Sequence, residues 1–311
     1  MAEHDSPHVP VLLQAVIDGL QIRADGNYID ATFGRGGHSV EILKRLGSAG
    51  RLLAIDRDPD AVRSADERLA GDPRFAMERS EIAQLEDIAA RHGLSGQVDG
   101  LLFDLGVSSP QLDDAARGFS FRNDGPLDMR MDPTTGTSAA EWLAKVDEKV
   151  LKKVLYQFGE ERFAPRIARA VVTARKTGPI TRTGQLAEIV RACVPSGGKR
   201  LHPATKTFQA IRIAVNDELQ QLDAALEAAP GVLREGGRLC VLSFHSLEDR
   251  RVKRFMRTAS RETEAYRGMP SVPAEFRPRL KLIGKAISAT PAEIRQNARS
   301  RSAHLRIAER L

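Results

Sequence analysis

Short apolar segments alternate with amphipathic stretches through the first third of the sequence, and this alternation restricts the fold more than any other feature. Strands are predicted at residues 28–32, 51–56, 74–78 and 98–104, and helices at residues 9–20, 38–47, 59–70 and 81–91. Strands separated by helices pair in parallel through right-handed crossovers. The sequence therefore predicts a doubly wound, mostly parallel, Rossmann-like α/β sheet with a ligand site at the carboxyl ends of its strands.

The alternation stops near residue 108. A long loop is predicted over residues 109–133, followed by helices near residues 139–157, 160–176 and 183–193. The sheet pattern resumes after a helix at residues 205–229, with a strand at 238–244 and an edge hairpin of residues 283–288 and 304–308. We therefore expect an all-helical subdomain, residues 108–203, inserted between two parts of the sheet domain, residues 1–107 and 204–311.

A glycine-rich turn follows the first predicted strand, and Asp30 precedes it by four residues. The turn contains Gly34, Gly36 and Gly37. Loops that bind a pyrophosphate place the anion at a helix N-terminus, where a fixed carboxylate would repel it. A cationic ligand fits better, and S-adenosylmethionine (SAM) carries a sulfonium and an ammonium group. Glycines at this turn would let the backbone approach the ligand. The sequence therefore favours a methyltransferase.

A second acid, Asp56, ends the second predicted strand 22 residues after Gly34. An acid at this place normally binds ribose hydroxyls. Ser39 stands where the dinucleotide fingerprint has its third glycine. Asp30 and Ser39 argue against an oxidoreductase that uses NAD. For the glycine turn at residues 34–37, the structural alternative is an ordinary strand-to-helix turn.

Two further segments carry polar groups at predicted strand ends. Asp104 begins the first, Asp104–Gln111, and could accept hydrogen bonds from an exocyclic amine held near a sulfonium methyl. The second, Leu242–Arg251, runs from a strand into a basic helix, with Ser246 as the expected N-cap and Asp249 as its partner. We predict Asp104, Ser108 and His245 as catalytic residues; a turn cap is the alternative for Asp104, and a structural role for His245.

Positive charge is concentrated in two blocks, although the whole chain has a net charge of only +6. Residues 162–212 carry +10 and residues 250–311 carry +11, so the remainder is strongly acidic. Segregation of this kind favours a polyanionic partner such as RNA, with solvated helix faces as the alternative. Two phenylalanines could stack on bases, with packing against the helical insert as the alternative for their rings. The predicted RNA contacts are Arg117, Phe119, Phe121, Lys199, Arg200, Lys206, Arg250, Arg251, Lys253 and Arg254.

The two cysteines, Cys193 and Cys240, lack metal-ligand spacing, and we expect neither a disulfide nor a metal requirement. The N-terminus has no basic leader, and no apolar run is long enough to span a membrane. The sequence thus predicts a cytoplasmic protein without membrane partners.

Long motifs resemble one known family. They are Asp30–Ser39, Ala54–Pro59, Asp104–Asp114, Arg117–Phe121, Gly125–Asp132, His202–Thr205, Thr207–Ala210 and Ser243–Asp249. Together they are similar to the bacterial ribosomal RNA small-subunit methyltransferase H family, also called MraW, over nearly the whole chain. The resemblance implies a class I SAM-methyltransferase fold with a helical insertion. It also implies N4-methylation of one cytidine in the decoding centre of 16S rRNA, near the ribosomal P site.

The same resemblance implies cofactor contacts. They fall on Gly36, Gly37, His38, Asp56, Asp104 and Gln111, with Ile82 at a position where the family often has an aromatic residue. With the residues of the acidic turn, the predicted cofactor site is Asp30, Gly34, Gly36, Gly37, His38, Asp56, Ile82, Asp104 and Gln111. A non-catalytic RNA-binding ribosome-assembly factor remains an alternative, but it would have no need of three acids at strand ends.

Overall fold

The computed structural model describes residues 10–195, 202–262, 266, 273 and 276–311. The chain divides into two compact units. The sheet unit consists of Met1–Gly106 and Gln220–Leu311, and the helical unit of Val107–Leu219. The helical unit therefore ends 16 residues beyond the boundary expected at residue 203.

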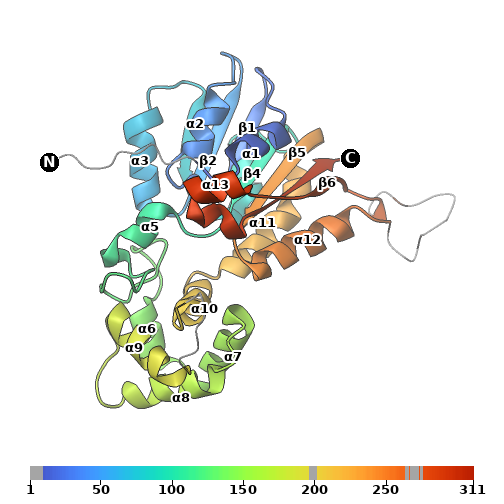
Figure 1. Ribbon diagram of the computed structural model, residues 1–311. Coiled ribbons are helices and arrows are strands. Elements are labelled where there is room, and N and C mark those ends of the chain that lie inside the picture. The colour runs from blue at the N-terminus through green and yellow to red at the C-terminus, as the bar shows by residue number, and fades with distance from the viewer. Residues whose placement is uncertain (1–9, 196–201, 263–265, 267–272, 274–275) are drawn as a thin grey trace. The chain divides into compact units, whose positions relative to one another are not determined.

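The sheet unit contains one seven-stranded sheet in the order β3-β2-β1-β4-β5-β7-β6 (Figure 1). Its strands are β1 (Asn27–Asp30), β2 (Arg51–Asp56), β3 (Phe75–Arg79), β4 (Val98–Asp104), β5 (Leu233–Ser243), β6 (Leu280–Ser288) and β7 (His304–Arg310). The first five strands pair in parallel, and β7 pairs antiparallel with both β5 and β6. The predicted doubly wound sheet is confirmed, with its topological switch point between β1 and β4.

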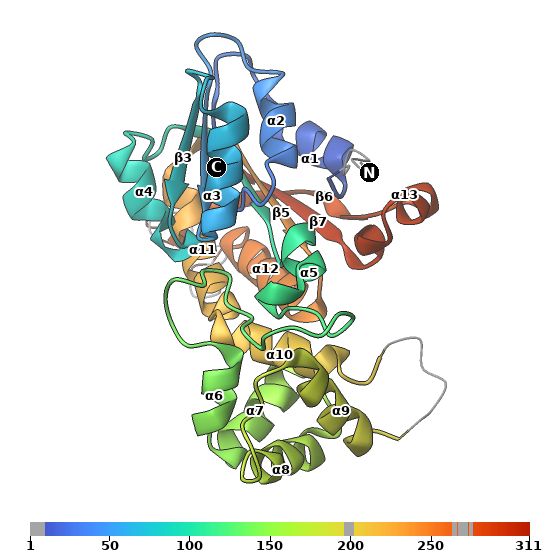
Figure 2. The same ribbon diagram turned by 90° about the vertical axis from the view of Figure 1, so that its left-hand side faces the viewer.

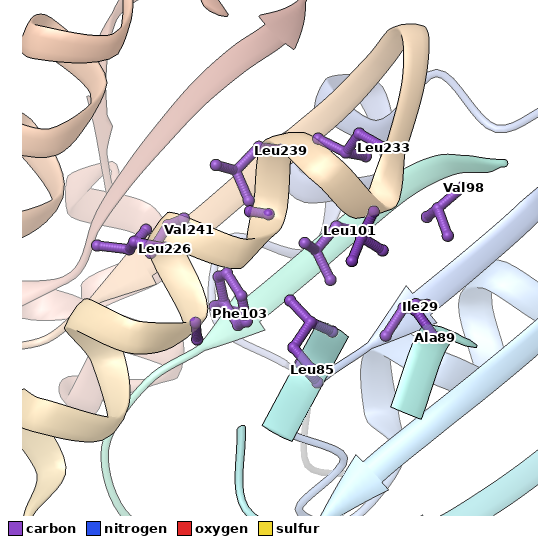
Figure 3. Close-up of a cluster of buried hydrophobic side chains, with 14 of the residues drawn as sticks. Ile29, Leu85, Ala89, Val98, Leu101, Phe103, Leu226, Leu233, Leu239 and Val241 are labelled. Carbon is purple, nitrogen blue, oxygen red and sulfur yellow. The ribbon is translucent and has the colours of Figure 1, made fainter. Parts of the chain in front are cut away.

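Helices cover both faces of this sheet, and its central parallel strands β1, β2 and β4 are largely buried. One face packs against α1 (Leu13–Leu20), α2 (Gly37–Leu43) and α3 (Pro59–Leu69). The other face packs against α4 (Leu85–Arg91), α11 (Glu218–Val232) and α12 (Ser246–Ala259). Side chains of β4 point alternately to the two faces. Leu101 and Phe103 pack into the core cluster on the face covered by α4, α11 and α12, shown in Figure 3, whereas Leu102 packs into the cluster on the opposite face.

Three short elements complete the sheet unit: η1 (Ile82–Gln84), α13 (Pro291–Gln296) and η5 (Ala298–Ser302). Among the described residues, no helix is long and apolar enough to cross a membrane.

The helical unit, whose helices α5 to α10 are labelled in Figure 2, has a hydrophobic core of its own. Its elements are α5 (Ser109–Asp113), η2 (Ala115–Arg117), α6 (Ala139–Lys145), α7 (Glu148–Gly159), α8 (Ala164–Ala174), α9 (Thr183–Cys193) and α10 (Thr205–Val215). Helix α10 belongs to this unit because Phe208 and Ile211 are buried in the same cluster as Leu151 and Leu155 of α7.

Two predictions about local structure were wrong. The expected loop at residues 109–133 begins with α5, which Ser108 and Gln111 start with a capping box. The expected single helix at residues 205–229 is broken after Val215, where Asp217 adopts a left-handed conformation with φ of 49°.

Asn216 accounts for this break. Its side-chain amide donates to the carbonyls of Met129 and Arg212, at 2.7 and 2.9 Å, and its Oδ1 accepts from the Met131 N–H at 2.8 Å. The residue is 2% exposed. The buried asparagine side chain thus forms hydrogen bonds with backbone groups of the irregular segment before α6. These groups lie outside any helix or strand that could pair them.

We expect Asn216→Ala to destabilise the helical unit by about 2–4 kcal/mol, because it leaves the buried Met129 carbonyl and the partly buried Met131 N–H without these partners. Denaturant unfolding of the full chain measures the loss. Asn123→Ala, at an exposed position in the same segment, is the control. Equal unfolding free energies for the two variants would contradict this account.

Candidate functional site

Three aspartates end adjacent parallel strands of the sheet unit. Asp30 is the last residue of β1, Asp56 of β2 and Asp104 of β4. Asp30 pairs in register with Ala54 and Leu102, so β2 and β4 each extend two residues beyond it. The three acids therefore lie at the same edge of the sheet, on both sides of the switch point, as the sequence predicts.

Asp30 is buried and anchors the start of α2. The Ser39 hydroxyl donates to its Oδ2 at 2.7 Å, and the Thr32 N–H donates to its Oδ1 at 3.2 Å. Desolvation by burial raises the pKa of this carboxyl, although the Ser39 hydroxyl and the nearby His38 act in the opposite direction. Ser39, which the sequence shows only as a missing glycine, thus has a positive role as the hydrogen-bond partner of Asp30.

The glycines of the turn are required by the fold of the chain itself. Gly34 and Gly36 have φ values of 56° and 71°, which side chains disfavour. A Cβ on Gly36 would also overlap the Phe33 ring, and one on Gly37 would lie 2.5 Å from Cγ of Pro10. The interpretation that these glycines exist to admit a ligand is therefore incomplete, because packing alone demands two of them.

Asp56 links the glycine turn to the start of α3. Its Oδ2 accepts from the Gly34 N–H at 2.8 Å and its Oδ1 from the Asp58 N–H at 2.9 Å. Burial nevertheless raises the pKa of Asp56 to about 6. Each oxygen retains a lone pair, so the carboxylate can also accept from hydroxyl groups of a ligand.

His38 and Asp104 form the polar centre of this edge. Nε2 of His38 lies 3.5 Å from Oδ2 of Asp104, and the histidine is 4% exposed. The Asp104 N–H donates to the Thr32 hydroxyl at 2.6 Å, which ties the ends of β1 and β4 together. Burial opposes the charged imidazole, but the contact with Asp104 and the charge of Asp30 outweigh it and raise the pKa of His38.

Several polar atoms of this pair are buried without a hydrogen-bond partner among the described residues: both ring nitrogens of His38 and Oδ1 of Asp104. Buried polar groups are almost always paired in folded proteins. Orphaned atoms beside a partly exposed carboxylate are therefore the expected mark of a ligand site.

His245 has a structural role that the sequence interpretation assigned to Ser246. It is the N-cap of α12, and its Nδ1 accepts from the Glu248 N–H at 3.3 Å. The carboxylate of Glu248 accepts from the N–H groups of Phe244 and His245 in return. The expected pair of Ser246 and Asp249 was wrong because Asp249 instead pairs with Arg306 of β7, at 2.8 Å.

The predicted basic patch on α12 divides between two faces of the helix. Arg250 and Lys253 line a cleft of about 410 Å³ together with His245, Ser246 and His304. Arg251 and Arg254 line a second cleft of about 290 Å³, where Arg251 pairs with Asp223 and Arg279 pairs with Glu227. Acidic partners therefore offset the second cleft, whereas the acid of the first cleft, Asp249, already pairs with Arg306.

Other predicted site residues belong to the helical unit. Ser108 caps α5, and its N–H donates to Oε1 of Gln111 at 2.8 Å. Gln111 is buried, and its predicted contact with a cofactor stays a prediction. Ile82, in contrast, lies in η1 of the sheet unit, half-buried against the core cluster.

The aromatic loop is used for packing. Phe119 is 6% exposed within the helical core, so the prediction that it stacks on RNA bases was wrong. Phe121 stacks on His202 with ring centroids 4.4 Å apart. The Arg117 guanidinium donates to the Met131 carbonyl at 2.8 Å and so closes the loop on itself. Long-range contacts of this kind leave no signal in a short motif.

Lys206 is exposed and donates to the Glu160 carbonyl at 2.8 Å. The predicted RNA contacts Lys199 and Arg200 lie outside the described residues.

Comparisons with known proteins agree on one family. The model of the MraW methylase family matches residues 5–311. Two curated relatives are both named ribosomal RNA small subunit methyltransferase H. The one from Thioalkalivibrio sulfidiphilus is 54% identical over 306 residues, covering 98% of this chain and 97% of its own. The one from Pseudoalteromonas atlantica is 52% identical over 306 residues, covering 98% of both chains.

Among solved structures, a SAM-dependent O-methyltransferase from Thermotoga maritima aligns with 100% of this chain and 68% of its own. The identity is 9% and the TM-score 0.42.

The raised pKa of Asp56 predicts a pH dependence of stability. In the unfolded chain this carboxyl ionises near its ordinary pKa, about 3.9, whereas in the folded chain it does so at about 6. The unfolded state therefore loses its proton first, and the free energy of unfolding falls as the pH rises through this interval. Between about pH 4 and pH 7, we expect the free energy of unfolding to fall by about 1–3 kcal/mol less in Asp56→Asn than in the wild type.

Denaturant unfolding across that pH range tests the prediction. Asp66→Asn, exposed on α3, is the matched control. Identical pH slopes for the two variants would show that Asp56 is not the group responsible.

Proposed function

The chain belongs to the MraW methylase family, and from this premise we propose that it methylates the exocyclic N4 of one cytidine in the decoding centre of 16S rRNA. Its cofactor is SAM. The relatives named ribosomal RNA small subunit methyltransferase H cover 98% of this chain and support its assignment as a methyltransferase of small-subunit rRNA. The observation that carries the finer proposal is the contact of the buried His38 with the partly exposed Asp104, with orphaned polar atoms at the switch point.

The residues at the strand ends fit SAM. When bound, SAM supplies an electrophilic methyl group on a positively charged sulfur. Asp30 and Asp104 give this edge the negative potential that a cationic ligand needs, and the low dielectric around buried groups strengthens it. Asp56 has lone pairs for two ribose hydroxyls, with Gly36, Gly37, Ile82 and Gln111 as further contacts.

Asp104 is suited to orient an amine. The lone pair of an exocyclic amine is conjugated into the base, and acceptors that hold its protons help the nitrogen to rehybridise. Oδ1 of Asp104 is free to accept such a proton, because only Oδ2 lies near His38. Positioning of this type supplies much of the acceleration in a transfer between two bound reactants. Ser108 and His245, the latter already the cap of α12, are assigned supporting roles.

The state of the cysteines favours nitrogen over carbon as the acceptor. Methylation at cytosine C5 requires a thiolate that adds to the ring. Burial raises the pKa of the Cys240 thiol to about 12, and the residue lies inside β5 with no exposed surface. Cys193 is also buried, at the end of α9, and burial raises its pKa as well. Methylation of N4 needs only extrusion of the base into a pocket.

RNA phosphates are assigned to the cleft at the N-terminus of α12. This cleft at the start of α12 is lined by Arg250, Lys253 and His304, and its arginine and lysine side chains are suited to phosphate contacts. A non-catalytic assembly factor would share such a surface. Mass spectrometry of 16S rRNA from cells with and without this protein separates the two functions, because only an enzyme leaves an N4-methylated cytidine.

We expect Asp104→Ala to lose most methyl transfer to 16S rRNA, whereas the double variant Cys193→Ser, Cys240→Ala remains active. The expected loss is on the order of a hundredfold in kcat, the scale for removing one well-placed catalytic group. Turnover assays with radiolabelled SAM measure both variants, and circular dichroism checks that they fold. A 5-methylcytidine product, or an inactive cysteine variant that still folds, would overturn the N4 assignment.

We expect the double variant Arg250→Gln, Lys253→Gln to weaken RNA binding more than its matched control, Arg251→Gln, Arg254→Gln. Both remove two positive charges from α12, but only the first removes them from the cleft whose acid, Asp249, pairs with an arginine outside the cleft. The slope of log affinity against log salt should fall by about 1.4 for the first pair, at about 0.7 per lost phosphate contact on single strands. Filter binding at several salt concentrations measures the slopes, and equal slopes would refute the assignment of the cleft.

A further inference from the structure

The exposed face of α7 combines lysines with an aromatic ring. Tyr156 is 69% exposed, more than any other aromatic side chain among the described residues. Lys149, Lys152 and Lys153 are also exposed on this helix. The opposite face of α7 carries the buried Leu151, Leu155 and Gly159, and packs against α8 and α10 (Figure 2). The fold of the helical unit is thus satisfied by the inner face alone.

Helical spacing brings the four side chains together. Lys152 and Lys153 precede Tyr156 by four and three residues, and Lys149 precedes it by seven, or about two turns. Their Cβ atoms therefore lie on one stripe, with neighbours about 5–6 Å apart. Within the described residues, none of the three ammonium groups has an ion-pair partner.

Part of this arrangement is unfavourable for the helix itself, although Glu148 stands at the favourable spacing of four residues before Lys152. Lys149 lies in the first turn of α7, where the helix dipole disfavours a cation. Its spacings to Lys152 and Lys153 bring like charges together, which also destabilises a helix. The exposed tyrosine ring contributes little to the core. Local rules broken without a structural gain are typical of functional surfaces.

We propose that this face of α7, made of Lys149, Lys152, Lys153 and Tyr156, docks a single-stranded segment of RNA, with the lysines on phosphates and a base stacked on Tyr156. Single strands are recognised through this pairing of positive charge with an aromatic platform, because every base offers a π face. A duplex hides its base faces and would leave the ring without a role. The inference rests on the proposed function, since it adds a contact for the same RNA substrate.

The affinity of an unstructured, fluorescein-labelled RNA of about 20 nucleotides tests the aromatic contact. Tyr156→Phe keeps a stacking ring, whereas Tyr156→Leu keeps apolar bulk without one. We expect the leucine variant to bind at least about fivefold more weakly than the phenylalanine variant, the lower end for loss of one base stack. The same RNA annealed into a duplex should not distinguish them. Equal affinities of the two variants for the single strand would overturn the proposal.

The salt dependence tests the lysines. The variant Lys149→Gln, Lys153→Gln should lower the slope of log affinity against log salt by about 1.4. The control Lys44→Gln, Arg45→Gln removes the same net charge from the two residues that follow α2, where both side chains already pair with Glu41. An unchanged slope in the α7 variant would overturn the proposal. So would a wild-type preference for poly-L-glutamate over RNA of equal charge, which would assign the face to an acidic protein.

Methylation of 16S rRNA by the wild-type protein is measured alongside. A wild type that methylates no rRNA refutes the proposed function. A wild type that methylates rRNA, with α7 variants that bind RNA as tightly as it does, refutes only the α7 surface.

Discussion

Three carboxylates gathered at one edge of a parallel sheet impose the constraint on which the site depends, because each loses hydration there. Nearby groups of the chain compensate for this lost hydration at each carboxylate. Ser39 donates to Asp30, two backbone N–H groups donate to Asp56, and His38 lies beside Asp104. These partners also shape the glycine turn, since Gly34, in a left-handed conformation that glycine readily adopts, donates its N–H to Asp56.

Periodicity and strand ends were sufficient to predict the sheet and the placement of these acids. Each of the first four strands is a short apolar run between helices, and parallel strands align their carboxyl ends. Asp30, Asp56 and Asp104 therefore lie at one edge for reasons that are visible in the sequence. The hairpin that closes one end of the sheet was predictable too. Of its two strands, β7 lies between β5 and β6, and β6 forms the edge of the sheet.

Features that depend on distant partners were not predictable. Asn216 breaks a continuous amphipathic pattern because it bonds Met129 and Met131, more than 80 residues away. Asp249 was expected in a capping box, but Arg306 of β7 binds it and leaves the cap to His245 and Glu248. Phe119 has the sequence neighbours of a stacking residue and the burial of a core residue. In each case a local motif is compatible with two outcomes, and tertiary contacts decide.

A cationic cofactor requires negative charge in the protein, whereas a polyanionic substrate requires positive charge. The chain meets both requirements because its strand-end acids are largely buried and the lysines and arginine proposed for phosphates are exposed to solvent. The acids act over a few ångströms within the protein, where salt screens little. The lysines and arginines of α7 and α12 act through solvent, where charges are screened beyond about 8 Å at physiological ionic strength. On the proposed function, cofactor affinity is therefore set by desolvation and protonation of strand-end groups, and RNA affinity by ionic strength. The two can be tuned separately because no residue proposed for phosphates lies among the acids.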